Sequence, residues 1–318
     1  MTAGLTTAPV AHLALVGPTA SGKSAVALAA AEALGDVEIV TVDSMQVYRG
    51  MDVGTAKPTA AERAAVPHHL LDLADPGEDF SVARFQAAAR AAIADIESRG
   101  RRALLAGGTG LYYQAVIDGF DLPAEDRELR ASLYERAGGP GGVEGLRRQL
   151  AELDPVAAGR IEPGNTRRIV RALEVTLATG RAFSSFGSGV FRDGPARLRV
   201  AAVGLWLSRA VTAARIEARI AAMVEDGLID EVRRLAAAPG GLSRTAREGI
   251  GYKEVLDHLE GAVPTLEAAL RRTAERTRQL ARRQRMWFRR DRRIAWIGCD
   301  GNSLAALPAV LATWNGLS

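Results

Sequence analysis

Cysteine and histidine are scarce in this sequence, and each shortage excludes a kind of structure. The 318 residues include one cysteine, Cys299, so no disulfide can form within the chain, and a reducing, cytoplasmic setting is expected. Of the four histidines, His68 and His69 are adjacent rather than at metal-ligand spacing, so no zinc site is predicted. We expect no membrane partner, because residues 1–10 do not resemble a signal peptide and no run of about eighteen apolar residues occurs.

The overall composition permits a sizeable core. Hydrophobic residues make up 47% and charged residues 25% of the chain, and its length suits one large domain or two smaller ones. The net charge of +4 is modest. Nucleic-acid binding must therefore be argued from how the basic residues are distributed. No self-complementary apolar stripe stands out, so we expect a monomer.

The strongest motif lies near the N-terminus, where Gly17–Ser24 reads GPTASGKS. It fits the phosphate-loop pattern G-x-x-x-x-G-K-[S/T] at every fixed position. The apolar run 12–16 before it predicts a buried strand, and the alanine-rich run 25–31 after it predicts a helix, which is the context such a loop requires. The sequence therefore predicts a phosphate site, and it leaves open whether the guest is a nucleoside triphosphate or another diphosphate.

The residues of this loop suit that chemistry. Gly17 and Gly22 allow the backbone N–H groups to turn inward, and the start of the following helix adds the positive end of its dipole. Lys23 offers a positive charge to the terminal phosphate oxygens, and the hydroxyl of Ser24 is placed to ligate Mg²⁺. We therefore expect Mg²⁺ as the cofactor.

Two later strands are expected to end near the same site. The β-branched run 37–43 predicts a strand that ends in Asp43, and ligands of open parallel sheets bind at the carboxyl ends of the strands. A helix N-cap is the alternative role for this aspartate. A third strand, from residue 102, runs into Gly107-Gly108-Thr109, where an ordinary P-loop NTPase often carries a magnesium-binding aspartate. The missing aspartate weakens a plain ATPase interpretation and indicates that Asp43 and Thr109 carry the polar chemistry.

Strand patterns disappear over residues 122–198, where short helices with glycine breaks are predicted. We therefore expect an α/β fold, with a P-loop NTPase-like parallel sheet flanked by helices over residues 1–121 and 199–318. Residues 122–198 would form an all-helical insertion domain.

One helix of this insertion is expected to begin near Asn165. Ile169, Leu173 and Leu177 fall at helical spacing and are expected to bury one face, while the arginines point largely elsewhere. A solvated charged face explains those arginines as well as a ligand does.

The most basic stretch of the chain is 270–293, in which arginines far outnumber acidic residues. A merely solvated helix would normally alternate the sign of its charges. Guanidinium groups are preferred partners of phosphates and stack on bases, so this helix is predicted to contact nucleic acid. Trp287 and Phe288 are expected to lie in the core rather than to stack on bases.

Several motifs, in order along nearly the whole chain, make the sequence resemble one family, the tRNA dimethylallyltransferases or isopentenyl-diphosphate:tRNA transferases, in their bacterial form. The resemblance rests on residues 17–24, 43–48, 51–58, 68–72, 107–112, 154–155, 171–175, 250–254 and 277–284. It implies that a dimethylallyl group passes from dimethylallyl diphosphate to the N6 amino group of the adenosine 3′-adjacent to the tRNA anticodon, with release of diphosphate.

The resemblance also implies roles for individual residues. Asp43 would be the general base, and Thr109 would hold the donor or the base in line. The diphosphate would be bound by Gly17, Thr19, Ala20, Ser21, Gly22, Lys23, Ser24 and Arg219, with Mg²⁺ at Ser24. The tRNA anticodon stem-loop would be contacted by Asp43, Ser44, Met45, Gln46, Thr109, Arg130, Arg167, Arg168, Ile169, Val170, Arg171, Arg278, Gln279, Arg282 and Arg283.

Two other functions compete with this interpretation. A small-molecule or nucleotide kinase of the P-loop class would bind and hydrolyse ATP, but it leaves the basic helix without a purpose. A non-catalytic RNA-binding module with a vestigial loop would bind tRNA whether or not Asp43 were present.

Overall fold

The computed structural model describes residues 12–123, 125–186, 196–299 and 301–317. The chain divides into two compact units, one of residues 1–119 and 194–318 and the other of residues 120–193. Within the first unit, the backbone N–H of Leu198 donates to the carbonyl oxygen of Ile117 at 2.9 Å. The first unit therefore resumes before residue 199, where the strand pattern had placed its return.

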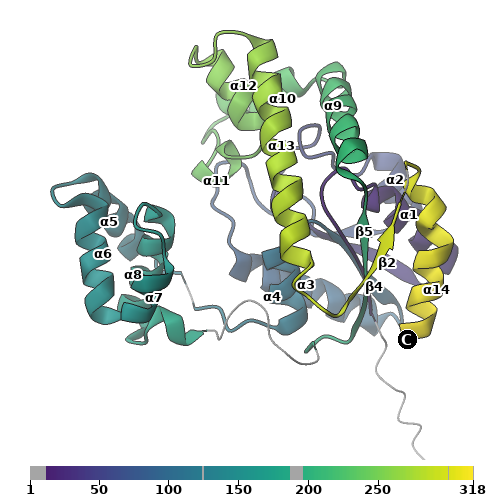
Figure 1. Cartoon of the computed structure of the whole chain (residues 1–318), viewed down its shortest axis with the longest axis horizontal. Coiled ribbons are helices and arrows are strands. Elements are labelled where there is room, and N and C mark those ends of the chain that lie inside the picture. The colour runs from purple at the N-terminus through teal and green to yellow at the C-terminus, as the bar shows by residue number, and fades with distance from the viewer. Residues whose placement is uncertain (1–11, 124, 187–195, 300, 318) are drawn as a thin grey trace, which may run out of the picture. The chain divides into compact units, whose positions relative to one another are not determined.

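The first unit is built on a six-stranded sheet in which every neighbouring pair is parallel (Figure 1). Its order is β3-β2-β4-β1-β5-β6. The strands are β1 His12–Val16, β2 Val37–Val42, β3 His68–His69, β4 Arg102–Gly107, β5 Val200–Trp206 and β6 Ile294–Gly298. The predicted α/β class, a P-loop NTPase-like parallel sheet flanked by helices, is confirmed.

Helices cover both faces of this sheet, which is why its central strands are nearly continuous apolar runs. Leu13 packs in one core with Val26 of α1 and with α14, whereas Ala14 packs in the other with Phe85 of α3 and with α4. The helices of the first unit are α1 Lys23–Leu34, α2 Ala60–Ala65, α3 Val82–Ser98, α4 Gly110–Asp118, α9 Arg209–Glu225, α10 Leu228–Ala237, α11 Arg244–Arg247, α12 Tyr252–Leu259, α13 Leu266–Phe288 and α14 Leu307–Leu317.

The register of the sheet brings three chain segments to one edge. Val16 at the end of β1 and Val42 at the end of β2 both pair with Gly107 at the end of β4. The phosphate loop follows directly after Val16 and Asp43 directly after Val42, and Thr109 is the second residue after Gly107. The strand ends therefore place them at the same carboxyl edge, as the sequence predicted.

The described residues of the second unit form helices joined by turns and loops: α5 Arg127–Gly138, α6 Gly142–Leu153, α7 Pro155–Arg160, α8 Thr166–Thr179 and the 3₁₀ turn η1 Phe183–Phe186. Ile169 and Leu173 of α8 lie in its core. The expected burial of Leu177 is wrong, because this side chain is 40% exposed. The buried face of α8 instead passes through Ala172 and Thr176.

None of the helices in the described parts of the chain combines the length and the apolar character that crossing a bilayer requires.

Candidate functional site

The predicted phosphate loop joins β1 to α1 in a tight turn. Ala20 and Gly22 both have left-handed backbone conformations, with φ of 62° and 78°. A Cβ at Gly22 would lie 2.2 Å from the Ser303 hydroxyl oxygen, so glycine is needed here for space as well as for backbone geometry. Helix α1 begins directly afterwards at Lys23, so its free N–H groups and the positive end of its dipole face the loop.

Three charged side chains act on one another beside this loop. The pKa of Lys23 is lowered to about 8, chiefly by burial; the nearby Arg219 lowers it further, while Asp43 opposes the shift. Burial also lowers the pKa of Arg219, again opposed by Asp43. The buried Nε atom of Arg219 has no hydrogen-bond partner among the described residues. Two desolvated cations thus share one nearby carboxylate, which makes this part of the molecule attractive to an anion.

Asp43 is held by a turn of the backbone directly after β2. Its Oδ1 accepts hydrogen bonds from the N–H groups of Met45 at 2.8 Å and Gln46 at 3.3 Å. The Oγ1 of Thr109 accepts a hydrogen bond from the N–H of Ser44 at 3.1 Å. Thr109 therefore positions the residue next to Asp43. In the described part of the chain, the Oδ2 atom of Asp43 takes part in no hydrogen bond, so it keeps its capacity to accept a proton.

The phosphate loop is supported by Arg215 of α9 and by Ser303 of the C-terminal segment. Arg215 of α9 donates to the carbonyl oxygen of Ala20 at 3.3 Å and to the hydroxyl oxygen of Ser303 at 2.7 Å. The Ser303 hydroxyl donates in turn to the carbonyl oxygen of Ser21 at 2.8 Å. Arg215 and Arg219 are one helical turn apart in α9. Arg215 binds the loop backbone, and Arg219 belongs to the charge cluster that it forms with Lys23 and Asp43.

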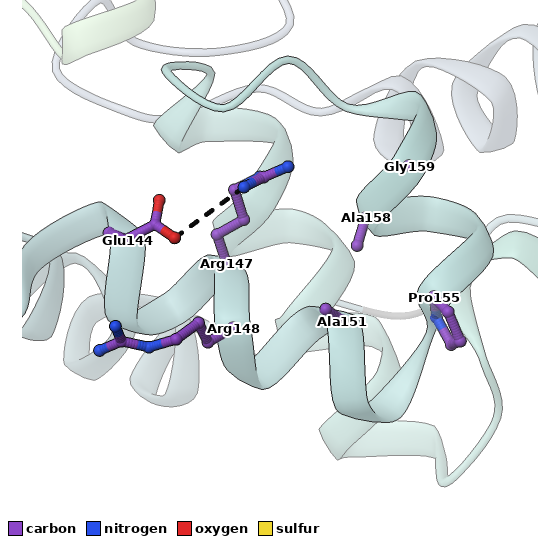
Figure 2. A pocket seen from close by; sticks show the side chains of 7 residues that line it. All are labelled: Glu144, Arg147, Arg148, Ala151, Pro155, Ala158 and Gly159. Atoms are coloured by element: carbon purple, nitrogen blue, oxygen red, sulfur yellow. Dashed lines mark ion pairs between the residues drawn. The ribbon is translucent and has the colours of Figure 1, made fainter.

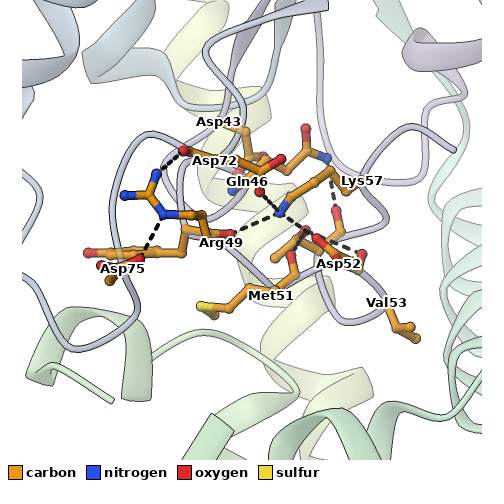
Figure 3. A network of polar contacts seen from close by, with 12 residues as sticks. Asp43, Gln46, Arg49, Met51, Asp52, Val53, Lys57, Asp72 and Asp75 are labelled. Atoms are coloured by element: carbon orange, nitrogen blue, oxygen red, sulfur yellow. Dashed lines mark hydrogen bonds and ion pairs between the residues drawn. The ribbon is translucent and has the colours of Figure 1, made fainter. Parts of the chain in front are cut away.

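A buried lysine organises the loop that follows Asp43 (Figure 3). The ammonium group of Lys57 donates to the carbonyl oxygen of Tyr48 at 2.9 Å and to the carboxylates of Asp52 at 2.5 Å and Asp72 at 2.7 Å. Its side chain is only 1% exposed. The charge of Lys57 is therefore used inside the protein, and this lysine has a structural role.

Gln46 joins the Asp43 turn to the same loop. Its Nε2 donates to the carbonyl oxygens of Thr55 at 3.0 Å and Ala56 at 3.1 Å. Both hydrogens of the amide nitrogen are thus occupied, and these two acceptors fix which way the amide group points. The acceptor oxygen is the group that Gln46 can still offer to a ligand.

A buried acid of α10, Glu231, also binds the loop that follows Asp43. The Glu231 carboxylate accepts hydrogen bonds from the N–H groups of Asp52, Val53 and Gly54 at 3.0, 2.9 and 3.1 Å. The Tyr252 hydroxyl donates to the same carboxylate at 2.6 Å. Glu231 of α10 thus holds the loop through three consecutive loop amides, and Tyr252 of α12 donates to the same carboxylate.

The implied tRNA contacts of the second unit differ in how they are placed. Arg167 and Arg168 are exposed at the start of α8, whereas Ile169 and Val170 are each only 1% exposed. Arg130 and Arg171 both bind the buried Glu174, which is 0% exposed, with shortest distances of 2.9 and 2.7 Å.

The exposed face of α13 carries the implied contacts of the first unit, since Arg278, Gln279, Arg282 and Arg283 all face solvent. The opposite face is buried and consists mainly of alanines, threonines and Phe288. The predicted burial of Phe288 is confirmed, and Trp287 is partly buried against the same core.

Comparison with known proteins gives the family. The family model described as IPP transferase matches residues 46–291, and a second, described as isopentenyl transferase, matches residues 10–72. The chain is 46% identical over 301 residues to a tRNA dimethylallyltransferase of Geobacter metallireducens, a match that covers 94% of this chain and 96% of the relative. The chain belongs to the IPP transferase family.

Solved structures of the family share its fold. A tRNA isopentenylpyrophosphate transferase from Bacillus halodurans matches with a TM-score of 0.68 and 38% identity, over 96% of this chain and 97% of the other. A eukaryotic dimethylallyltransferase described as acting on tRNA matches with a TM-score of 0.73 and 26% identity, over 90% of this chain and 73% of the other.

The sequence did not indicate four residues that hold the loops of this candidate site. They are Arg215, Glu231, Ser303 and Gln284, of which Gln284 was noted only as part of a longer motif. Gln284 of α13 contacts the phosphate loop through Thr19, a residue 265 positions away. The motif 277–284 was a signal for Gln284, but nothing in the local pattern names its partner.

The second unit of this family member also contains a pocket of about 250 Å³ between α6 and α7 (Figure 2). Glu144 and Arg147 form an ion pair of 3.9 Å on its rim. Its lining consists of Glu144, Arg147, Arg148, Ala151, Pro155, Ala158 and Gly159. It contains none of the residues predicted to bind the donor or tRNA.

Proposed function

We propose that this chain transfers the dimethylallyl group of dimethylallyl diphosphate to tRNA, at the N6 amino group of the adenosine 3′-adjacent to the anticodon, and releases diphosphate. The observation that carries the proposal is the charge cluster beside the phosphate loop. Lys23 and the desolvated Arg219 suit the anionic leaving group, and Asp43 is the carboxylate beside both. The family membership makes a prenyl diphosphate, rather than a nucleotide, the expected guest.

The leaving group accounts for the two cations. As the allylic C–O bond breaks, negative charge grows on the diphosphate oxygens, and fixed positive groups stabilise that charge. Lys23, Arg219 and the N–H groups at the start of α1 are the groups of this chain that serve the purpose. Arg215 and Ser303 hold the loop from behind and keep these groups in position.

The nucleophile accounts for the carboxylate. An exocyclic adenine amino group is a weak nucleophile, and it must lose a proton as its nitrogen bonds to carbon. Asp43 would accept that proton at Oδ2, while its Oδ1 stays bound to the amides of Met45 and Gln46. Thr109 acts through the Ser44 N–H and sets the direction of the carboxylate.

The phosphate loop also fits a magnesium ion. Mg²⁺ prefers hard oxygen ligands and commonly takes one or two from the protein and others from substrate phosphates. Ser24 offers an exposed hydroxyl in the first turn of α1, beside Lys23. Bound there with the diphosphate, the ion would neutralise part of the leaving group's charge.

The arginines on α13 and at the start of α8 supply the tRNA contact in this proposal. Exposed guanidinium groups bind the phosphate backbone of the anticodon stem-loop, and the target adenosine must be flipped out of its stack to reach Asp43. We assign these phosphate contacts to Arg278, Arg282, Arg283, Arg167 and Arg168, and a further tRNA contact to the exposed Gln279. We further propose that the protein works in the cytoplasm as a monomer.

The test is direct transfer. The protein is incubated with labelled dimethylallyl diphosphate, Mg²⁺ and an unmodified tRNA transcript, and label is expected in the RNA at the adenosine beside the anticodon. A transcript with guanosine at that position is the matched control and should stay unlabelled. ATP turnover without labelled RNA would overturn the proposal in favour of a kinase. Binding of tRNA without transfer would favour a non-catalytic module.

A further inference from the structure

Gln284 of the arginine-rich helix α13 connects two loops of the proposed donor site. Its Oε1 accepts a hydrogen bond from the N–H of Thr19 in the phosphate loop at 2.7 Å. Its Nε2 donates to the carbonyl oxygen of Gly108, in the turn after β4, at 2.9 Å. A donor on one side and an acceptor on the other fix the orientation of the amide, so one side chain bridges both segments.

The glycines of the turn after β4 make room for this contact. A Cβ at Gly108 would lie 2.5 Å from the Nε2 of Gln284, and a Cβ at Gly110 would lie 2.1 Å from the Cδ1 of Trp287. Gln284 and Trp287 are three positions apart and so share one face of α13. The sequence Gly108-Thr109-Gly110, which stands where many P-loop enzymes carry an aspartate, is thus the surface on which α13 docks.

Thr109 lies between Gly108 and Gly110 and connects this turn to the segment of Asp43, the proposed general base. Its Oγ1 accepts the N–H of Ser44, the neighbour of Asp43. On the other side, the Thr19 N–H is committed to Gln284, so this amide holds the loop in place and leaves anion binding to other groups of the loop. The spacing between the phosphate loop and the Asp43 turn therefore depends on Gln284, which belongs to neither segment.

We propose that Gln284 is a positioning residue for the transfer reaction. It holds the phosphate loop and the Thr109 turn at the spacing that in-line attack requires, and it ties both to the helix whose exposed arginines bind tRNA. The inference rests on the proposed function. The reaction itself is unchanged, because Gln284 exchanges no proton with either substrate.

Two substitutions separate this role from mere support of the fold. Gln284→Ala removes both hydrogen bonds, whereas Gln284→Glu keeps the length and the acceptor for Thr19 but loses the donor to Gly108. Because attack depends on the placement of reacting groups, kcat should fall roughly 10- to 100-fold in both variants, and the KM for dimethylallyl diphosphate should rise in Gln284→Ala. The Kd for tRNA should stay within about twofold, since the arginines that bind phosphate are untouched.

Gln149→Ala is the matched control, because it removes a partly buried glutamine that accepts a hydrogen bond from Arg136 in the second unit. It should leave kcat and KM unchanged. Wild-type kcat and KM in folded Gln284→Ala would overturn the inference, as would a loss confined to tRNA affinity. If Gln284→Ala fails to fold, Gln284→Glu decides alone by the same constants. Failure of transfer by the unmodified protein would instead refute the proposed function, so the two failures are distinct.

Discussion

Tyr252 donates its hydroxyl hydrogen to the Glu231 carboxylate at 2.6 Å, and the two side chains are only 1% and 3% exposed. Burial raises the pKa of Tyr252 above its usual value, and the negative charge of Glu231 raises it further. Glu231 stays satisfied because three amides of the loop at residues 52–54 donate to it as well. The loop that follows Asp43 thus depends on an acid far along the chain.

Replacing this acid should cost much stability. Glu231→Ala leaves three loop amides and a buried phenol without an acceptor, so the free energy of unfolding should fall by about 3 kcal/mol or more. Tyr252→Phe removes a single donor from an otherwise satisfied carboxylate and should cost about 1 kcal/mol. Urea unfolding of both variants measures the difference. Equal, small losses would show that the loop is held by other contacts.

Asp43→Asn tests the general base while keeping the turn. An asparagine Oδ1 can still accept the N–H groups of Met45 and Gln46, so the backbone should keep its shape. Because an amide cannot take up the amino proton, kcat should fall by roughly 10²–10⁴-fold, with the affinities for tRNA and donor nearly unchanged. Single-turnover kinetics measure the chemical step. A wild-type rate would remove Asp43 from the mechanism.

The lowered pKa of Lys23 predicts a pH dependence for diphosphate binding. Lys23 is protonated below a pH of about 8 in the free protein and loses its proton above it. A bound anion favours the protonated form, so above the pKa, binding must be accompanied by proton uptake. Affinity for inorganic diphosphate should therefore fall as pH rises, by up to about tenfold per pH unit.

Titration calorimetry on the protein and on Lys23→Met measures this slope, and the variant corrects for ionisation of diphosphate itself. A slope that persists unchanged in Lys23→Met would assign the effect to another group.

Folding stability should respond to Lys23 in the opposite sense. Because the pKa of Lys23 in the folded protein, about 8, lies below the ordinary lysine value of 10.5, the unfolded chain binds one more proton than the folded protein between these two pH values. The contribution of Lys23 to the free energy of unfolding therefore rises with pH across this window and is lost as pH falls through about 8. Thermal unfolding measures this: as pH rises above about 8, the stability of the unmodified protein should increase relative to that of Lys23→Met.

Glu174 should be essential to the second unit. Its carboxylate is fully buried and pairs with Arg130 and Arg171 while accepting the N–H of Asp126 at 2.9 Å. Glu174→Ala leaves two partly buried arginines without their main partner and should destabilise the unit by about 3–5 kcal/mol. Glu144→Ala, which removes the long surface pair with Arg147, should cost less than about 1 kcal/mol. Proteolysis within residues 125–186, followed over time, compares the two variants.

The arginines of α13 should give tRNA binding its salt dependence. Replacing Arg282 and Arg283 with glutamine removes two phosphate partners, so tRNA affinity should fall and the slope of log K against log salt should decrease by about 1.5. Arg233→Gln, on the exposed side of α10, is the charge control and should leave the slope unchanged. An unchanged slope in the double variant would show that Arg282 and Arg283 face solvent without contacting tRNA phosphates.

Local patterns were sufficient for much of this protein. The phosphate loop, the strand before it and the helix after it follow from spacing and glycine content within Gly17–Ser24 and its flanks. The placement of Asp43 and Thr109 followed because parallel strands end at a common edge. The strand β6 was missed, because Ile294–Gly298 directly follows the arginine-rich helix and is too short to show a clear alternation.

Tertiary structure alone decided which distant residues complete the site. Gln284 meets Thr19 across 265 positions, and Glu231 meets the N–H groups of residues 52–54 across 177 to 179 positions. It also decided that Arg130 and Arg171 are committed to Glu174 while Arg167 and Arg168 stay exposed. Backbone preferences and periodicity act over a few neighbouring residues, so they can be read from the sequence. Which side chain satisfies a buried amide or carboxylate depends on how the packed elements meet, and only the folded chain brings those partners together.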